Sequence, residues 1–162
     1  MSSRDCTRCS AMTLKGKRCR RSTCKYSDQC HQHTIKHKKL QIKTSQIPNS
    51  GNGLYTTQDI KKGQVIVPYG GKVITIEEYR ESGSTYGIHI NKKYILDGAS
   101  TQSGLGRWAN SCTSRNKKSK DCRGNNAKIA INAKNMTANL KATRNISSGE
   151  EIFLSYGRGF WS

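Results

Sequence analysis

Apolar positions along this chain fall into short runs that are separated by glycine-containing turns. Leu40 and Ile42 alternate with polar residues, as in a strand with one buried face. Residues 65–67 form an apolar run that Pro68 is expected to end. Further apolar segments occupy residues 72–74, 87–90, 94–96, 128–131, 139–142 and 152–154, and the segments at 87–90 and 94–96 are expected to form a hairpin around Asn91-Lys92-Lys93. Because these runs are shorter than ordinary helices, the pattern predicts a mainly β fold of short strands.

Helical signals are few. Thr75 and Glu78 have the spacing of a capping box, which predicts a short helix ending near Ser82. Residues 106–110 are expected to form a single helical turn. Residues 113–126 are basic and polar, and we expect them to form a long solvated loop.

Cysteine and histidine are concentrated in the first 39 residues, which contain almost no aliphatic side chains. Such a segment buries too little apolar surface to hold itself folded, and a bound metal ion would supply folding free energy. Thiolate and imidazole ligands favour zinc. We expect residues 1–39 to form a basic zinc-stabilised module and residues 40–162 to form the main domain. The expected zinc ligands are Cys9, Cys19, Cys30 and His33.

Alternatives stay open for this module. Its spacing matches no standard zinc finger closely, so Cys24 or Cys6 could replace one of the four ligands. The module could also be a disordered basic tail with incidental thiols. Residues 15–21 could serve as a nuclear-import or phosphate-contacting run, or could be a solvated run of charge.

The formal net charge is +19, from 29 Lys and Arg residues against 10 Asp and Glu residues. Residues 1–43 hold 12 of the basic residues and 2 of the acidic ones, so this part is the more densely basic. A field of this sign attracts polyanions, chiefly nucleic acid or nucleoprotein. No apolar run approaches the roughly 18 residues of a membrane span. We therefore expect an intracellular, nuclear protein (in the host nucleus if it is viral) that contacts nucleic acid and not a membrane.

Several common chemistries lack their residues. Gly51-Asn52-Gly53 does not begin a dinucleotide-binding fingerprint, because Thr56 stands where a third glycine is needed. A phosphate-binding loop with Gly-Lys-Ser/Thr is also absent from the sequence. His89 is the only histidine beyond residue 39, and its place between two isoleucines favours a surface or packing role over a catalytic triad.

One ordered set of motifs remains, and it resembles the SET-domain lysine methyltransferases over roughly residues 40–160. The motifs are Gly51-Asn52-Gly53-Leu54-Tyr55, Pro68-Tyr69-Gly70-Gly71, Tyr86, Arg107-Trp108-Ala109-Asn110-Ser111-Cys112, Asn125-Asn126-Ala127 and the Gly-Glu-Glu-Ile-Phe-Leu-Ser-Tyr-Gly stretch at residues 149–157. The earlier Thr-Leu-Lys-Gly-Lys-Arg-Cys and Cys-His-Gln-His pieces look like a short cysteine/histidine module that is joined to such domains in some viral and protist proteins.

The resemblance implies a SET-type β-clip whose last stretch passes under a loop around residues 107–126, in a knot-like threading. It implies S-adenosylmethionine as the cofactor and Tyr156 as the catalytic residue, whose hydroxyl would orient the amine and the methyl group. The implied cofactor-binding residues are Gly51, Asn52, Gly53, Leu54, Tyr86, Arg107, Asn110, Ser111 and Tyr156. The sequence departs from the family at Ser111, where histidine is usual, and in the long insert between Cys112 and Asn126.

The implied reaction explains why no general base is obvious. A lysine side chain has a pKa of about 10.4 in water, and a narrow apolar channel would favour its neutral, nucleophilic form. Holding the amine, methyl and sulfur in line can lower the barrier by about 7–11 kcal/mol. Candidate walls of the channel are Tyr69, Tyr86, Ile88, Trp108 and Trp161.

The leading hypothesis is an S-adenosylmethionine-dependent protein-lysine N-methyltransferase. Its expected substrate is a histone in a nucleosome or another nucleic-acid-bound protein. The positive charge would steer the protein to nucleic acid and not to a free cationic tail. One alternative is a non-catalytic nucleic-acid-binding protein with a SET-like scaffold. Another is a structural zinc protein without enzymatic activity.

Overall fold

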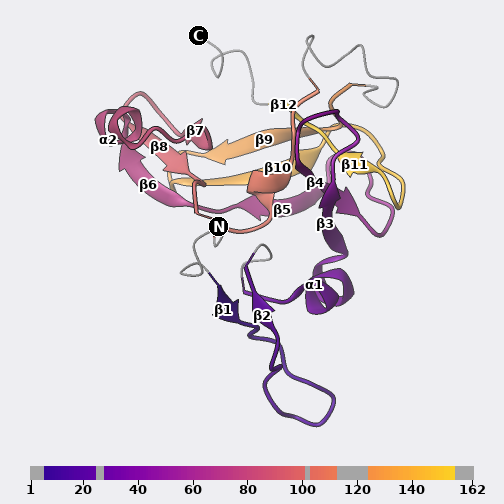
Figure 1. The fold of residues 1–162 in the computed structure, drawn as a ribbon. Helices are drawn as coiled ribbons and strands as arrows, with labels where there is room; N and C mark the ends of the chain where they lie inside the picture. The colour runs from indigo at the N-terminus through magenta and orange to yellow at the C-terminus, as the bar shows by residue number, and fades with distance from the viewer. Residues whose placement is uncertain (1–5, 25–27, 101–102, 113–123, 156–162) are drawn as a thin grey trace.

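Short strands dominate the fold. The computed structural model describes residues 6–24, 28–100, 103–112 and 124–155. Within these residues the strands form a two-stranded sheet near the N-terminus, a four-stranded sheet and two three-stranded sheets (Figure 1). The helices are α1 His31–Lys38, α2 Ile76–Ser82 and the 3₁₀ helix η2 Gly106–Trp108. The predicted mainly β class with few short helices is confirmed.

The sheets are almost entirely antiparallel. The four-stranded sheet has the order β12-β9-β10-β5, and the three-stranded sheets have the orders β11-β4-β3 and β6-β8-β7. In the described residues the one parallel ladder joins β12 to β9. The strands are β1 Thr7–Arg8, β2 Ser22–Thr23, β3 Leu40–Thr44, β4 Asn52–Thr56, β5 Val65–Tyr69, β6 Lys72–Thr75, β7 Gly87–His89, β8 Tyr94–Asp97, β9 Ala127–Asn132, β10 Thr137–Ala142, β11 Glu151–Ile152 and β12 Leu154–Ser155.

The last described segment joins two sheets. β11 pairs with β4 and β12 pairs with β9, with Phe153 between them. On one side of this segment, the N–H of Leu154 donates to Asn110 O at 2.7 Å, and on the other the N–H of Asn126 donates to Phe153 O at 2.9 Å. The segment therefore runs between the two flanks of the insert, as the expected threading requires. The insert itself, residues 113–123, lies outside the described residues.

Pro68 does not end its strand, contrary to expectation. β5 continues to Tyr69, and Pro68 lies opposite Asn139 of β10. The reason is that β5 is the edge strand of its sheet. Proline lacks only the donor N–H, and an edge strand has one side on which no ladder partner needs that donor.

Two local signals predicted their elements well. Thr75 and Glu78 form the full capping box at the start of α2. β7 and β8 form the expected hairpin, in which the Asn91 side chain accepts hydrogen bonds from the N–H groups of Lys93 and Tyr94 at 2.9 Å each. In contrast, α1 was not predicted, because it lacks an apolar stripe and Thr34 is its only buried residue.

The main core lies between the sheets of the body. Its fully buried side chains include large ones from β3, β4, β10 and the last segment: Leu40, Leu54, Leu140, Ile152 and Leu154. The final apolar run is therefore an integral part of the core. None of the helices in the described residues is both long and apolar enough to cross a membrane.

We predict that Leu140→Ala lowers the free energy of unfolding by about 2–5 kcal/mol, because Leu140 is fully buried and the change leaves a cavity. Val65→Ala, at a side chain that is 53% exposed on the edge strand, should change it by less than about 1 kcal/mol. Urea denaturation measures both. Equal losses of unfolding free energy in the two variants would contradict this location of the core.

Candidate functional site

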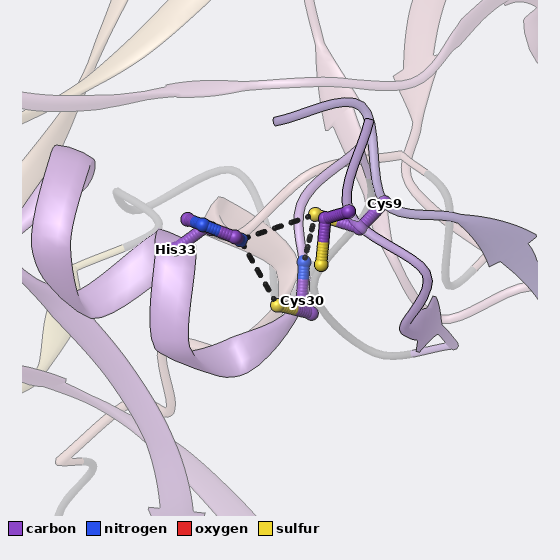
Figure 2. A group of neighbouring side chains, drawn as sticks. Cys9, Cys30 and His33 are labelled. Carbon is purple, nitrogen blue, oxygen red and sulfur yellow. Dashed lines mark hydrogen bonds between the residues drawn. The ribbon is translucent and has the colours of Figure 1, made fainter. Parts of the chain in front are cut away.

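Three cysteines and one histidine meet in the N-terminal part. Cys9 follows β1, Cys30 immediately precedes α1, and His33 lies in the first turn of that helix. The Nδ1 of His33 lies 3.5 Å from Cys9 Sγ and 3.3 Å from Cys30 Sγ, so that these side chains point toward one another (Figure 2). With Cys19, their ligand atoms all lie within 4.8 Å of one another. The structure thus brings together the four residues that were expected to bind zinc.

The distances suit a tetrahedral zinc site. Typical Zn–S and Zn–N bonds imply edges of roughly 3.6 Å between sulfur and nitrogen ligands. The three thiols are buried and His33 is half-buried. Burial opposes ionisation of Cys9, but hydrogen bonds from the backbone at Cys30 and Ala11 outweigh burial and lower the pKa of its thiol. Burial raises the pKa of the Cys30 thiol.

The alternative ligands Cys6 and Cys24 do not join this cluster. They form a disulfide with each other at the open end of the β1–β2 hairpin. Two guanidinium groups link the strands of the hairpin between this disulfide and the hairpin loop. Arg8 Nε donates to Cys19 O at 2.9 Å, and Arg18 Nε donates to Cys9 O at 3.0 Å. The described part of the module is therefore a folded hairpin and helix and not a disordered tail.

A second site is organised around the buried carboxylate of Glu151, which is 1% exposed. Its Oε1 accepts a hydrogen bond from Ser45 Oγ at 2.7 Å, and its Oε2 accepts one from the Gln46 N–H at 2.8 Å. The Tyr55 hydroxyl lies 3.1 Å from Oε2 and 2.7 Å from Thr44 O. Glu151 forms no ion pair with a described residue, so these donors compensate its charge.

The Glu151 carboxylate constrains the size of residue 53 and the protonation of Tyr55. A Cβ added to Gly53 would overlap the Glu151 carboxylate, so that any larger residue there would displace it. Burial, together with the charge of Glu151 and the hydrogen bond to it, raises the pKa of Tyr55 to about 12. Tyr55 therefore keeps its proton and remains a donor at neutral pH.

Asn110 connects this carboxylate to the glycine turn. Its Nδ2 donates to Asn52 O at 2.9 Å and lies 3.5 Å from Glu151 Oε1. Gly51, at the turn, has φ +66°, and its carbonyl accepts the Ser45 N–H at 2.8 Å. Contacts with Glu151 and Ser45 thus bring together four of the predicted cofactor-binding residues: Gly51, Asn52, Gly53 and Asn110.

Arg107 and Tyr86, two further predicted cofactor-binding residues, form a separate group. The Arg107 guanidinium lies 4.2 Å from the Tyr86 ring centre and 4.6 Å from that of Trp108. Its Nε donates to Gly98 O at 2.7 Å and its Nη2 to Ala99 O at 3.1 Å. The buried cation thereby fixes the backbone after β8, and its contact with a cofactor stays a prediction.

The remaining site predictions have different outcomes. Leu54 is fully buried, so its side chain belongs to the core. Ser111 is half-buried directly after Asn110. Tyr156, the predicted catalytic residue, lies outside the described residues, immediately after Ser155 of β12.

The candidate channel walls also divide into two groups. Tyr69 and Ile88 are core residues with 3% and 5% exposure, and the Tyr69 hydroxyl donates to Tyr86 O at 2.8 Å. Tyr86 and Trp108 retain exposed surface beside Arg107. Trp161 lies outside the described residues.

Sequence reasoning missed the roles of Glu151 and Asn126. Asn126 is 1% exposed, its Nδ2 donates to Glu151 O, and its Oδ1 accepts the Phe153 N–H. The Asn126 side chain thus pairs with the backbone of the last segment as a neighbouring strand would. The available signal for Glu151 was its place as the second of two glutamates, directly before the apolar run of residues 152–154.

We predict that Glu151→Gln lowers the free energy of unfolding by about 1–3 kcal/mol, because an amide offers one oxygen where two now accept hydrogen bonds. The matched control is Glu150→Gln. Glu150 forms an exposed ion pair with Arg144 at 3.5 Å, so its loss should cost less than about 1 kcal/mol. Chemical denaturation at neutral pH compares them, and a larger effect at Glu150 would contradict the assignment.

Comparison with known proteins relates this geometry to a family. A sequence model of the SET domain matches residues 51–157. N-lysine methyltransferase KMT5A of Xenopus tropicalis is 29% identical over 128 residues, which cover 72% of this chain and 36% of that protein. KMT5A-A of Xenopus laevis is 30% identical with the same coverage. KMT5A-A of Danio rerio is 29% identical over 123 residues, which cover 68% of this chain and 33% of that protein.

This chain spans about a third of the length of these relatives. The SET-domain match covers more than half of the 162 residues and includes Glu151, Gly53, Tyr55 and Asn110 of the second site. The chain therefore belongs to the SET-domain family.

Proposed function

We propose that the protein is an S-adenosylmethionine-dependent protein-lysine N-methyltransferase. The observation that carries this proposal is the cluster of Asn52, Gly53 and Asn110 around Glu151 within the SET-domain match. The names of the relatives describe N-lysine methyltransferases and support the same reaction. In this proposal residues 40–162 form the catalytic domain and residues 1–39 form a docking module.

The glycine turn and Asn110 fit the proposed cofactor. A Cβ added to Gly51 would meet no heavy atom within 4 Å, which leaves room for a ligand against its backbone. Asn52 and Gly53 pair with β3 alone, whereas the middle of β4 pairs on both sides. We propose that these residues hold the cofactor with Asn110 and Ser111. Arg107 and Tyr86 would border it, and Leu54 would support the turn from the core.

The protein's part in the reaction is to favour the neutral lysine amine, whose proton passes to solvent, and to align it with the methyl group. S-adenosylmethionine, when bound, supplies an electrophilic methyl group. Half-exposed aromatic surface at Tyr86 and Trp108 would border the lysine side chain and favour its neutral amine. The hydroxyl of Tyr156 would orient this amine. In-line positioning is the main source of catalysis, and the general estimate for it is about 7–11 kcal/mol.

The substrate is proposed to be a lysine of a histone or of another nucleic-acid-bound protein. The net charge of +19 favours an encounter with nucleic acid over an encounter with a free basic tail. The same charge suits an intracellular, nuclear location. Which lysine is methylated would be decided by the channel and by docking together.

Zinc is the proposed occupant of the Cys9, Cys19, Cys30 and His33 cluster. Three buried thiols and an imidazole match the ligands that zinc prefers, and a bound ion would cross-link the hairpin to α1. The metal would stabilise the docking module and take no part in methyl transfer.

The first test is transfer of labelled methyl groups from S-adenosylmethionine to nucleosomes and to lysate proteins. We expect the wild-type chain to label a lysine-containing protein, and Tyr156→Phe to reduce labelling by about 10²-fold or more through loss of the orienting hydroxyl. Tyr94→Phe, the same chemical change on the β6-β8-β7 sheet, is the matched control and should retain most activity.

Two results would each contradict a different part of this proposal. One is absence of transfer combined with absence of S-adenosylmethionine binding by calorimetry, which would favour the non-catalytic nucleic-acid-binding alternative. The other is equal activity of Tyr156→Phe and wild type, which would remove Tyr156 from the catalytic role.

For the metal, we expect one zinc ion per chain after purification and a large loss of zinc in Cys19→Ser, because three ligands bind more weakly than four. The double variant Cys6→Ser/Cys24→Ser removes two cysteines of the same module that lie outside the cluster, and it should keep its zinc. The zinc content of each variant is measured by mass spectrometry. Equal zinc loss in both variants would show that the ligand set is wrong.

A further inference from the structure

The N-terminal hairpin has one buried face and one basic exposed face. Cys6 and Cys24 are joined at its open end, and one antiparallel register continues from the Thr7–Thr23 pair to the Met12–Arg18 pair. Side chains therefore alternate between the two faces. On one face Cys9, Ala11, Cys19 and Thr23 are buried, although Thr7 and Arg21 of the same face are exposed. The other face is exposed throughout and consists of Arg8, Ser10, Met12, Arg18, Arg20 and Ser22.

The loop of this hairpin extends away from the sheets of the body (Figure 1). It is closed by the Thr13 N–H, which donates to Lys17 O at 2.8 Å, and it turns at Gly16 with φ +69°. Leu14 at the tip is 98% exposed, and Lys15 and Lys17 beside it are exposed as well. An apolar side chain held this far from the core contributes nothing to folding.

The charge of the hairpin is of one sign. Residues 6–24 contain six Lys and Arg residues and no Asp or Glu. Lys15, Lys17, Arg20 and Arg21 form no ion pair with a described residue. Arg8 and Arg18 donate to backbone carbonyls through two of their five N–H groups, which leaves donors for an external acceptor.

We propose that this hairpin, residues 6–24, is a DNA-docking ribbon that enters the major groove of duplex DNA tip first. This inference rests on the proposed recruitment of the enzyme to nucleic acid and assigns that contact to one element. A major groove admits a two-stranded β-ribbon, basic side chains on its exposed face reach phosphates, and Leu14 contacts base edges. A metal ion bound by Cys9, Cys19, Cys30 and His33 would keep the opposite face rigid.

The same surface is less suited to an anionic membrane. Anchoring in lipid scales with the buried apolar area, and this hairpin offers two exposed apolar side chains, Leu14 and Met12. Phosphate contacts, in contrast, need only the exposed cations. The chemistry of the hairpin therefore favours a nucleic-acid duplex.

The test uses the full chain purified with its bound metal and a fluorescent 20-base-pair duplex, with affinity measured by anisotropy over a series of salt concentrations. Lys15→Gln/Lys17→Gln should weaken binding at least about tenfold at low salt. It should also reduce the slope of log K against log salt by about 1.8, which corresponds to two lost phosphate contacts. Leu14→Ser should weaken binding roughly fivefold and leave the slope unchanged, because the lost contact is not ionic.

The matched control is Lys61→Gln/Lys62→Gln. These lysines are also exposed in a turn beside a glycine with positive φ, Gly63 at +86°, but they lie on the body. They should change affinity by less than about twofold. Equal losses in the two double variants would overturn the proposal, because binding would then follow net charge and not the hairpin.

Vesicles of phosphatidylcholine and phosphatidylserine provide the competing outcome. If Leu14→Ser abolishes vesicle binding and leaves duplex binding unchanged, the hairpin is a membrane anchor and the proposal is wrong. Methyl transfer to a free protein substrate is measured in parallel. Hairpin-dependent duplex binding without methyl transfer would support the ribbon and overturn only the enzyme assignment.

Discussion

The structure of the body depends on one buried negative charge. An ionised carboxylate with 1% exposure is stable only where several donors surround it, and the donors of Glu151 come from residues 45, 46 and 55, about 100 positions earlier. Because Glu151 also fills the space beside Gly53 and approaches Asn110, the last segment shapes the proposed cofactor turn. The core and the candidate site are therefore formed by the same strand pairing.

The N-terminal part follows a different physical principle. Its hairpin and α1 bury few apolar side chains, and its buried cluster consists of Ala11 and the three free cysteines. A cross-link at this cluster can replace a hydrophobic core, since metal binding contributes directly to folding. This leaves the other hairpin face free to carry charge. A short segment can thus be rigid on one side and strongly basic on the other.

Local chemistry made many features predictable. Alternation indicated β3, the capping box indicated α2, and Asn91 marked the hairpin between β7 and β8, because each signal involves neighbouring residues only. The Cys/His cluster was predictable from ligand chemistry, although the hairpin and helix that position it were not. Pro68 was misread because its tolerance depends on β5 being an edge strand, which no local pattern reveals.

The sequence by itself determined the mainly β class, the motif order of the SET domain, the basic character of the N-terminal part and the residue types available for metal binding. Only the tertiary structure decided which cysteines pair with each other, which ones face His33, and that Glu151 is buried against Ser45. The physical reason is that pairing, burial and charge compensation are properties of groups brought together from distant positions. The residue type determines which interactions a group can form, and the fold determines which groups lie close enough to form them.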